Sequence, residues 1–600
     1  MAMGLLHLPL PSPLSSFTTT QPLPSHSNLC ILSRMVTRPT TVAKEVYDES
    51  IVRRSANYQP PIWKHEFVQS LTSEFMEETC LNRRDILKER VKMMVTEELV
   101  GDPLRQLEVV DELQRLGLSY HFEKEINEIL EIIMNDRLHG EKNYNMEWKK
   151  NNLYATALQF RILRQHGYHV PQEVFNEFKE EMETCSICTV CEERAKGMLS
   201  LYEASFLAME GENYLDEARN FALKYLCNYL KSNSNGIFSI MVRHALELPI
   251  HWRMQRLEAR WFIDVYERKP DSSLMLLELA KLDFNILQST HQAELKHVSR
   301  WWKSTGLGEK LGFARDRLMP NFLWSVGMST SELHLGYFRR MTTKIASLIT
   351  IIDDVYDVYA TLDELELFTD AIERWDIAAI HQLPDYMKIC FIALHNTIND
   401  MAFDALKEQG VNVIQYLRKV WVDLCKTFLI EAKWYYTDCK PTLEEYLENA
   451  WISVSGPLLL VHAYVFVTKS ITKEDLEGLE DYPDIIRYSS MIFRLSNDLA
   501  SSSDEAKRGE VAKSLQCYMN DTGASEHEAR THIKGLIIES WKRMNRLHSS
   551  NSSSYFSQTF FEIASNLARI AHTVYQHRDG HTVEDHESKD RVLSLFINPI

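Results

Sequence analysis

Hydrophobic residues recur at three- and four-residue spacing along nearly the whole chain after residue 60. One such stretch consists of Ile126, Ile129, Leu130, Ile133 and Met134. This spacing gathers the apolar side chains on one face of an α-helix. Glycine and proline are few and fall between stretches of this kind, as in residues 167–171. No segment keeps the period-two alternation with hairpin turns that β-strands show. The pattern therefore predicts an all-α fold built by helix packing.

A polar segment divides the predicted helices into two blocks. Residues 268–273 read Arg-Lys-Pro-Asp-Ser-Ser, a composition typical of a linker between domains. We therefore expect one domain over residues 51–270 and a second over residues 271–600. A polar turn within one domain would look the same. Nearly all clusters of acidic and basic residues with chemical meaning fall in the second block.

The first residues of the chain differ in composition from the rest. Residues 1–44 contain no Asp or Glu and hold twelve Ser or Thr, together with Arg34, Arg38 and Lys44. Acid-poor, Ser-rich and weakly basic leaders are typical of organellar transit peptides. We therefore expect residues 1–50 to be a transit peptide and disordered leader. A disordered tail without an address is the alternative.

Bulk charge and cysteine spacing exclude several partners. The net charge of −18 argues against nucleic acid, because phosphate-binding surfaces usually show a basic stripe. The apolar stretch 457–467 is short and contains His462, so we expect no membrane-spanning helix. Cys185, Cys188 and Cys191 form C-x2-C-x2-C but lack a fourth cysteine at metal-site spacing. We interpret them as thiols of a reduced intracellular protein.

An aspartate-rich motif at 351–357, Ile-Ile-Asp-Asp-Val-Tyr-Asp, is the strongest chemical signal. Asp353 and Asp357 are four residues apart, and Asp354 and Asp357 are three apart, so helical geometry places their carboxylates on one face. A divalent cation would relieve the repulsion between them. Hard oxygen donors of this kind suit Mg²⁺ or Mn²⁺. A solvated acidic turn of helix is the alternative.

A second polar face occurs far downstream. Asn497, Ser501 and Glu505 are spaced at i, i+4 and i+8, and together they offer the amide, hydroxyl and carboxylate oxygens of a hard-cation site. Asn and Ser are poor residues for a helix interior, so their placement calls for a reason. Coincidence or a helix end would also explain it.

Arginines near both motifs supply the local positive charge that an acidic chain needs to bind a polyanion. Arg315 and Arg317 flank Asp316, and Arg494 precedes Asn497 by three residues. Guanidinium groups bind phosphate oxygens through paired hydrogen bonds. As isolated features, arginines at this spacing are usually solvated surface residues.

Taken together, these motifs resemble those of the plant terpene synthases that begin catalysis by metal-dependent ionisation. The resemblance covers nearly the whole chain after the leader. The matching segments, in the family's order, are Arg53-Arg54 with Trp63, residues 256–262, residues 315–317, residues 353–357 and residues 497–505. The paired arginines and the distant tryptophan, behind a transit-like leader, resemble the monoterpene synthase branch.

The resemblance implies a fold and a set of site residues. The fold would be an N-terminal helical barrel-like domain and a C-terminal class I helical bundle with an apolar pocket. Three Mg²⁺ ions, or Mn²⁺, would be held by Asp353, Asp357, Asn497, Ser501 and Glu505, with Asp354 in support. The diphosphate would be bound by Arg315 and Arg494, next to Asp353, Asp357 and Asn497, with Arg317 and Lys507 as further candidates. Arg53, Arg54 and Trp63 would serve the lid and isomerisation, and Trp324 and Tyr575 would line the pocket.

The resemblance also implies a reaction. Geranyl diphosphate would be ionised to a carbocation, which is then deprotonated, cyclised or captured by water, in a plastid enzyme that is a monomer or weak homodimer. Ala346 stands where isoprene synthases tend to carry Phe, which argues against a five-carbon substrate. Alternatives are a sesquiterpene synthase using farnesyl diphosphate, a chain-elongating prenyltransferase and a non-catalytic helical binding protein. His577, His581 and His586 are assigned no metal, because the resemblance places that segment in a loop over the site.

Overall fold

The computed structural model describes residues 53–99, 101–139, 148–179, 191–329, 333–508, 513–549, 556–582 and 585–600. The chain divides into two compact units, Met1–Arg53 and Arg54–Ile600, and every described helix belongs to the second. The predicted leader, Cys185 and Cys188 lie outside the described residues. So do the side chains of Glu505 and Lys507.

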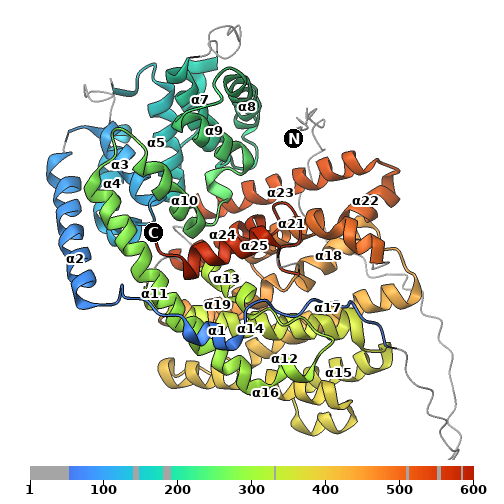
Figure 1. Ribbon diagram of the computed structural model, residues 1–600. Coiled ribbons are helices and arrows are strands. Elements are labelled where there is room, and N and C mark those ends of the chain that lie inside the picture. Colours follow the sequence, from blue (N-terminus) through green and yellow to red (C-terminus); the bar gives the residue numbers. More distant parts are fainter. Residues whose placement is uncertain are drawn as a thin grey trace, which may run out of the picture. The chain divides into compact units, whose positions relative to one another are not determined.

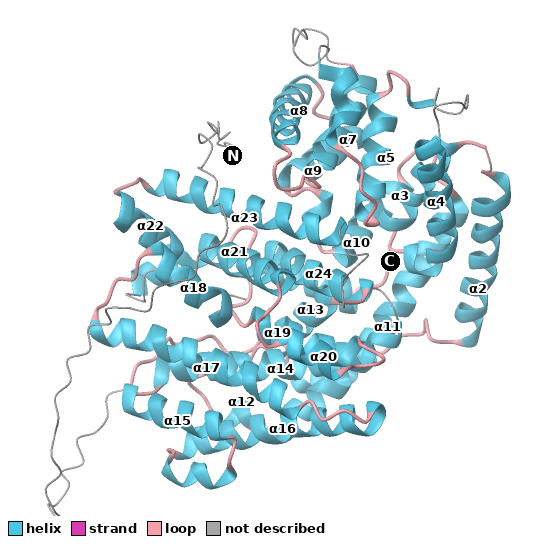
Figure 2. Ribbon diagram, turned by 180° about the vertical axis from the view of Figure 1, so that it is seen from behind, coloured by secondary structure: helices cyan, strands magenta, loops and turns pink. Residues whose placement is uncertain are grey.

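Every regular element that the structure describes is a helix, as the hydrophobic spacing predicted, and none of the described residues forms a strand (Figures 1 and 2). Two helices come after the N-terminal strap at residues 54–64: α1 (His65–Ser70) and α2 (Glu78–Met93). The remaining α-helices of the first block are α3 (Pro103–Arg115), α4 (Glu123–His139), α5 (Leu153–Gln165), α7 (Glu192–Ser205), α8 (Asn213–Ser232), α9 (Ile237–Glu247) and α10 (Gln255–Glu267).

The second block is longer and carries a cavity lined by Asp353 and Asp357. Its α-helices are α11 (Leu274–Thr305), α12 (Leu307–Lys310), α13 (Leu318–Met328), α14 (Gly336–Asp354), α15 (Leu362–Arg374), α16 (Asp385–Gln409), α17 (Ile414–Thr437), α18 (Leu443–Ser453), α19 (Gly456–Val467), α20 (Lys473–Leu479), α21 (Asp484–Arg508), α22 (Ser514–Thr522), α23 (Glu526–Ser549), α24 (Gln558–Val574) and α25 (His586–Val592).

The polar segment at residues 268–273 lies between two helices of the structure. Helix α10 ends at Glu267 and α11 begins at Leu274, where the Ser273 hydroxyl caps the helix by accepting from the Leu276 amide. One hydrophobic cluster nevertheless runs through both blocks, and a smaller cluster lies within α7–α9. The division into residues 51–270 and 271–600 therefore stays a prediction.

Helix α19 lies at the centre of the second block, in contact with α14, α17, α21 and α24. It is apolar on every side, and its residues 456–465 are buried, as expected for a helix surrounded by others. With α18 it forms the stretch Leu443–Val467, which by length and composition could cross a membrane, but the apolar 18-residue window within it is 83% buried in the fold. The stretch is thus part of the protein core.

Helices α18 and α19 are separated by a break at Ser455, which lines the cavity. Ser455 adopts a left-handed conformation with φ of 70°, which ends the helical path of α18. At the next residue, Gly456, an added Cβ would lie 2.2 Å from the Ser490 Oγ on α21. Only glycine therefore allows α19 to approach α21 this closely.

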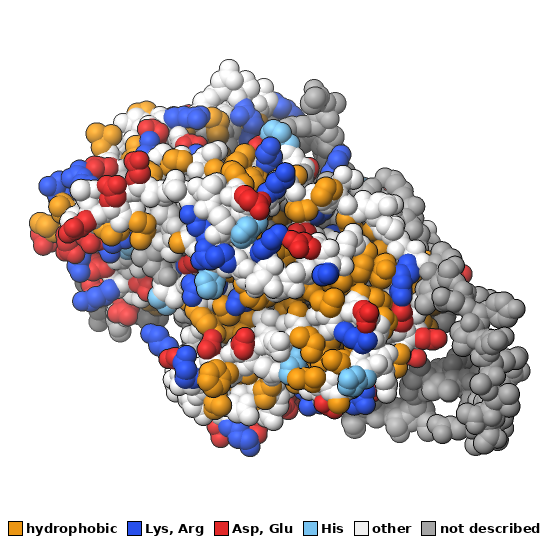
Figure 3. Space-filling model, turned by 60° about the horizontal axis from the view of Figure 1, so that its bottom comes forward, with side chains coloured by type: hydrophobic (Ala, Val, Ile, Leu, Met, Phe, Trp, Pro, Cys, Tyr) orange, Lys and Arg blue, Asp and Glu red, His pale blue; other side chains and the backbone are white. Residues whose placement is uncertain are grey.

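On the face shown in Figure 3, acidic and basic side chains are mixed among hydrophobic ones and do not gather into one basic stripe.

Candidate active site

A cavity in the second block has an acidic side and an apolar side. Asp353 and Asp357 line it from the end of α14 and the turn after it. The opposite wall is mostly apolar and aromatic, with Trp324, Met328, Ile349, Phe428, Leu459 and Phe493. Such a combination of a few polar groups at one end and an apolar body is typical of small-molecule sites.

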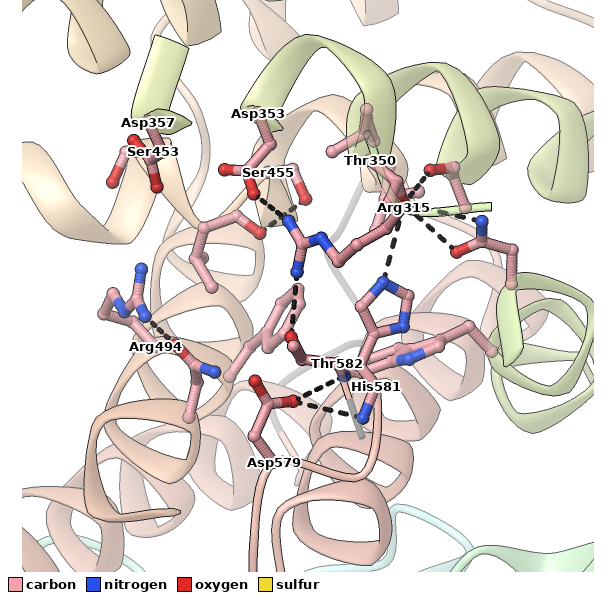
Figure 4. Close-up of a pocket in the computed structure, with 18 of the residues that line it drawn as sticks. Arg315, Thr350, Asp353, Asp357, Ser453, Ser455, Arg494, Asp579, His581 and Thr582 are labelled. Atoms are coloured by element: carbon pink, nitrogen blue, oxygen red, sulfur yellow. Dashed lines mark hydrogen bonds and ion pairs between the residues drawn. The ribbon is translucent and has the colours of Figure 1, made fainter. Parts of the chain in front are cut away.

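The aspartate motif lies on a helix that changes its pitch. Helix α14 ends at Asp354, and residues 355–359 form a π-helical turn, a feature often found at functional sites. The sequence predicted a continuous α-helix here. Asp353 and Asp357 still both face the cavity (Figure 4). Burial is the main reason that the pKa of Asp353 is raised, and Arg315 and Lys513 oppose that rise.

Asp354 has a different part from its neighbours. It is fully buried and accepts from the backbone N–H of Arg315 at 2.7 Å and from its Nε at 3.0 Å. The same guanidinium donates to Asp353 and, at 2.9 Å, to the Thr582 hydroxyl. Asp354 thus fixes Arg315 at the cavity from behind, in keeping with the supporting position expected for it.

Arg317 does not line the cavity. Its guanidinium is buried and donates to the backbone carbonyls of Gln59 and Thr582, at 3.2 Å each. It therefore ties the N-terminal strap to the C-terminal loop. Arg317 and Arg315 point in different directions because residues 315–317 lie in a non-helical segment before α13.

The second predicted metal face lies on α21. Arg494 and Asn497 line the cavity, and Arg494 forms an ion pair with the buried Asp498 at 2.8 Å. The Ser501 hydroxyl is buried and donates to the Asn497 carbonyl at 3.0 Å. Because the side chain of Glu505 lies outside the described residues, the complete three-residue set stays a prediction. Among the described residues, no group of three His, Cys, Asp or Glu forms a metal cluster by itself.

Lys513 is a cation that the motifs did not indicate. It precedes α22, lines the cavity, and is buried with its Nζ 3.6 Å from a carboxylate oxygen of Glu431 on α17. No spacing rule connects Lys513 to the α21 motif sixteen residues upstream. Only the fold brings it to the site; Lys507, the further candidate that the resemblance offered, has its side chain outside the described residues.

Three aromatic rings form one wall of the cavity. The ring centroid of Trp324 lies 4.8 Å from that of Phe493 and 5.9 Å from that of Tyr575. The ring centroids of Phe493 and Tyr575 lie 6.2 Å apart. The faces of such rings attract cations. The predicted pocket positions of Trp324 and Tyr575 thus fall on the same wall.

The loop after α24 covers another part of the cavity. Asp579 accepts from the backbone N–H groups of His581 and Thr582 at 3.1 and 3.0 Å, which holds the loop in shape (Figure 4). The His581 Nε2 lies 3.5 Å from the Thr350 hydroxyl, and its buried Nδ1 has no hydrogen-bond partner among the described residues. Burial lowers the pKa of His581 to about 3, so the imidazole is neutral at pH 7.

The N-terminal strap contributes one residue to the cavity. Tyr58 lines it, with the Arg315 guanidinium carbon 5.2 Å from the ring centroid. Arg54 lies farther out, 4.1 Å from the ring of Tyr435 on α17. Trp63 packs against Phe67 outside the cavity. Arg53 falls in the other compact unit, so its part in a lid stays a prediction.

Two family models match the chain over most of its length. "Terpene synthase, N-terminal domain" matches residues 62–246, and "Terpene synthase family, metal binding domain" matches residues 303–543. A chloroplastic myrcene synthase of Quercus ilex is 58% identical over 550 residues, which cover 92% of this chain and 90% of the relative. A (-)-alpha-terpineol synthase of Vitis vinifera is 57% identical over 92% of each chain.

Solved structures show the same fold. A limonene synthase with 2-fluorolinalyl diphosphate superimposes with a TM-score of 0.85 at 45% identity, over 92% of this chain and 100% of that one. An isoprene synthase of Populus x canescens, in complex with three Mg²⁺ ions and dimethylallyl-S-thiolodiphosphate, has a TM-score of 0.80 at 46% identity, over 90% and 99% of the two chains. The predicted fold of two helical domains is thereby confirmed.

Proposed function

The chain belongs to the terpene synthase family, and we propose that it is a monoterpene synthase that ionises geranyl diphosphate. The observation that best supports this proposal is that the cavity has a charged end and an apolar end. One side of the cavity is lined by the charged side chains of Asp353, Asp357, Arg315, Arg494 and Lys513. Aromatic and aliphatic side chains form the other side. A substrate with a diphosphate head and an apolar allylic tail matches this division.

The oxygen donors of the polar end fit divalent cations. Asp353, Asp357 and Asn497 offer carboxylate and amide oxygens to the same cavity, the donor set that Mg²⁺ prefers. We propose that these residues, with Ser501 and Glu505, hold three Mg²⁺ ions, or Mn²⁺ in their place. When bound, the ions would supply positive charge that stabilises the leaving diphosphate.

The three cations of the cavity are proposed to bind the diphosphate directly. Arg315 and Arg494 are each held by a buried carboxylate, Asp354 and Asp498 respectively, so their donors are oriented before substrate arrives. Preorganised donors stabilise charge that develops as the C–O bond breaks. Lys513 adds a third positive charge at the same end.

The apolar end is proposed to shield the carbocation from bulk water, so that deprotonation, cyclisation or capture of one admitted water decides the product. Trp324, Phe493 and Tyr575 present ring faces that stabilise positive charge. Tyr58 and the loop with Asp579 also line the cavity. His581 lines the cavity as a neutral imidazole, so one of its ring nitrogens can accept a proton, and a carbocation is acidic enough to give one to a weak base.

Ten carbons are proposed for the substrate because the similar proteins include myrcene and (-)-alpha-terpineol synthases. Several relatives are named chloroplastic, and together with the composition of residues 1–50 this supports a plastid protein. We further propose residues 51–270 and 271–600 as the two domains, since the family matches fall inside these ranges. Monomer or weak homodimer stays a prediction.

Incubation of the purified protein with geranyl diphosphate and Mg²⁺, followed by gas chromatography of the volatiles, tests the proposal. We expect a ten-carbon product that disappears when a chelator removes the metal. A competition arm with farnesyl diphosphate distinguishes the main alternative. Faster turnover of the fifteen-carbon substrate would make the protein a sesquiterpene synthase, and no diphosphate release from either substrate would contradict the reaction class.

A further inference from the structure

A buried carboxylate lies in the cavity wall without a place in the metal-binding motifs. Glu431, on α17, is 6% exposed and lines the cavity. The Asn449 amide donates to it at 3.1 Å, the Ser453 hydroxyl also donates to it, and the Lys513 ammonium pairs with it at 3.6 Å. The partners come from α18 and from the start of α22, so Glu431 joins three elements at the site.

A buried carboxylate in the cavity wall is unfavourable for both stability and catalysis, so its presence needs an explanation. It repels a diphosphate, and an unpaired carboxylate facing a carbocation is a nucleophile that would capture it. Burial of an ion is unfavourable unless the ion is paired and hydrogen-bonded. Here one oxygen of Glu431 accepts from Ser453 and Asn449 and the other faces Lys513. The Lys513 ammonium therefore supplies the opposite charge that the buried Glu431 needs.

The other two cations of the cavity show the same arrangement. Arg315 forms an ion pair with Asp354, and Arg494 forms one with Asp498. Both aspartates are fully buried. Asp498 also accepts from the Ser514 backbone N–H at 3.2 Å, next to Lys513. Each of the three cations that line the cavity among the described residues thus has a buried carboxylate beside it, and for Lys513 that carboxylate is Glu431.

We propose that Glu431 is a positioning residue that holds the Lys513 ammonium toward the diphosphate end of the cavity. Its bond from Ser453 fixes it to the last residue of α18, beside the break at Ser455. The proposal rests on the proposed function, because the group that Lys513 binds is the diphosphate of the substrate. Lys513 on its long flexible stem needs such a support more than a planar guanidinium does.

Glu431→Gln removes the charge while preserving the shape. The glutamine oxygen can still accept from Ser453, and its amide can donate to the Asn449 Oδ1, which is buried without a hydrogen-bond partner among the described residues. The matched control is Glu373→Gln. Glu373, on α15, forms an ion pair with Lys426 at 2.6 Å. Lys426 is on α17, as Glu431 is, but this ion pair lies on the surface. Glu431→Asp keeps the charge and withdraws it by one methylene group.

The test is a double-mutant cycle of Glu431→Gln and Lys513→Met in the full-length protein, read out as kcat, KM for geranyl diphosphate and the inhibition constant of inorganic diphosphate. We expect Glu431→Gln to raise KM and the inhibition constant about tenfold, as the loss of a charge-assisted contact does. The double variant should be no worse than Lys513→Met alone. Glu431→Asp should lie between wild type and Glu431→Gln, and Glu373→Gln should match wild type.

Two results would overturn the proposal: losses that multiply in the double variant, or an inhibition constant for diphosphate that Glu431→Gln leaves unchanged. Calorimetric binding of inorganic diphosphate with Mg²⁺ repeats the cycle without turnover. If the wild type failed to convert geranyl diphosphate, the proposed function would fail. The binding cycle would still decide whether Glu431 positions Lys513.

Discussion

At the scale of single residues, the carboxylates at the site have two different roles. Asp353 and Asp357 face the cavity, where a cation can reach them. Asp354 and Asp498 are fully buried and hold arginines. Because Asp353 lines the cavity whereas its neighbour Asp354 is buried behind Arg315, their variants should fail in different ways.

Asp353→Asn is expected to weaken the metal response. Loss of a carboxylate ligand should lower kcat by about a hundredfold and raise the Mg²⁺ concentration needed for half-maximal activity. A Mg²⁺ titration of diphosphate release measures both. Asp370→Asn, which alters a surface ion pair with Arg374, is the control and should behave as wild type. An unchanged Mg²⁺ response in Asp353→Asn would exclude it as a ligand.

Asp354→Asn is expected to act through Arg315. The asparagine can accept only part of the hydrogen bonding that the Arg315 backbone and guanidinium now direct at Asp354. The KM for geranyl diphosphate should rise about tenfold, while the Mg²⁺ concentration for half-maximal activity stays near that of wild type. Steady-state kinetics at saturating and limiting Mg²⁺ separate the two. A shifted Mg²⁺ response would instead make Asp354 a metal ligand.

Distance along the chain decides which parts of the site the sequence could predict. Asp353 and Asp357 are one helical turn apart, so a spacing rule places them together. Lys513 and Glu431 are separated by 82 positions (513 − 431) and meet only after α17, α18 and α21 have packed. Tyr58 reaches the cavity from the opposite end of the chain. No local pattern encodes contacts of that kind.

At the scale of elements, the site depends on irregularities within helices. The π-helical turn after Asp354 and the break between α18 and α19 both lie at the cavity. Periodicity predicted the helices around them correctly, because apolar spacing reports the buried face. It could not predict the irregularities: the break before α19, for example, lies where Gly456 packs closely on Ser490 of another helix.

Gly456→Ala is expected to disturb that packing. The new Cβ would lie 2.2 Å from the Ser490 Oγ and 3.0 Å from its Cα, so α19 and α21 must move apart. We expect a loss of about 1–3 kcal/mol in unfolding free energy and a lower kcat, because α21 carries Arg494 and Asn497. Denaturant unfolding and kinetics measure these effects. Gly478→Ala on α20, with nothing within 4 Å of its Cβ, should be neutral or slightly stabilising, and equal behaviour of the two variants would contradict the argument.

At the scale of the whole molecule, the helical core has buried histidines along with apolar groups. His251, His462 and His572 are all buried. Burial lowers the pKa values of His251 and His572 to about 3 and that of His462 to about 4. The ordinary value is about 6.5, so the unfolded chain binds protons at these sites at a pH where the folded chain does not. The histidines were visible in the sequence, but their burial arises only in the assembled core.

The protein is therefore expected to lose stability as the pH falls from 7.5 to 5.5. Each of the three histidines should cost about 1 kcal/mol of unfolding free energy over that interval, because stability falls where the unfolded state binds more protons. Glu203 opposes this trend, since burial raises its pKa to about 7, and it offsets part of the loss. Thermal unfolding at the two pH values measures the net effect. His462→Gln should make the pH dependence shallower, whereas His527→Gln, at an exposed position on α23, should leave it unchanged. A pH dependence that both variants share with wild type would show that His462 does not contribute to the loss of stability in acid.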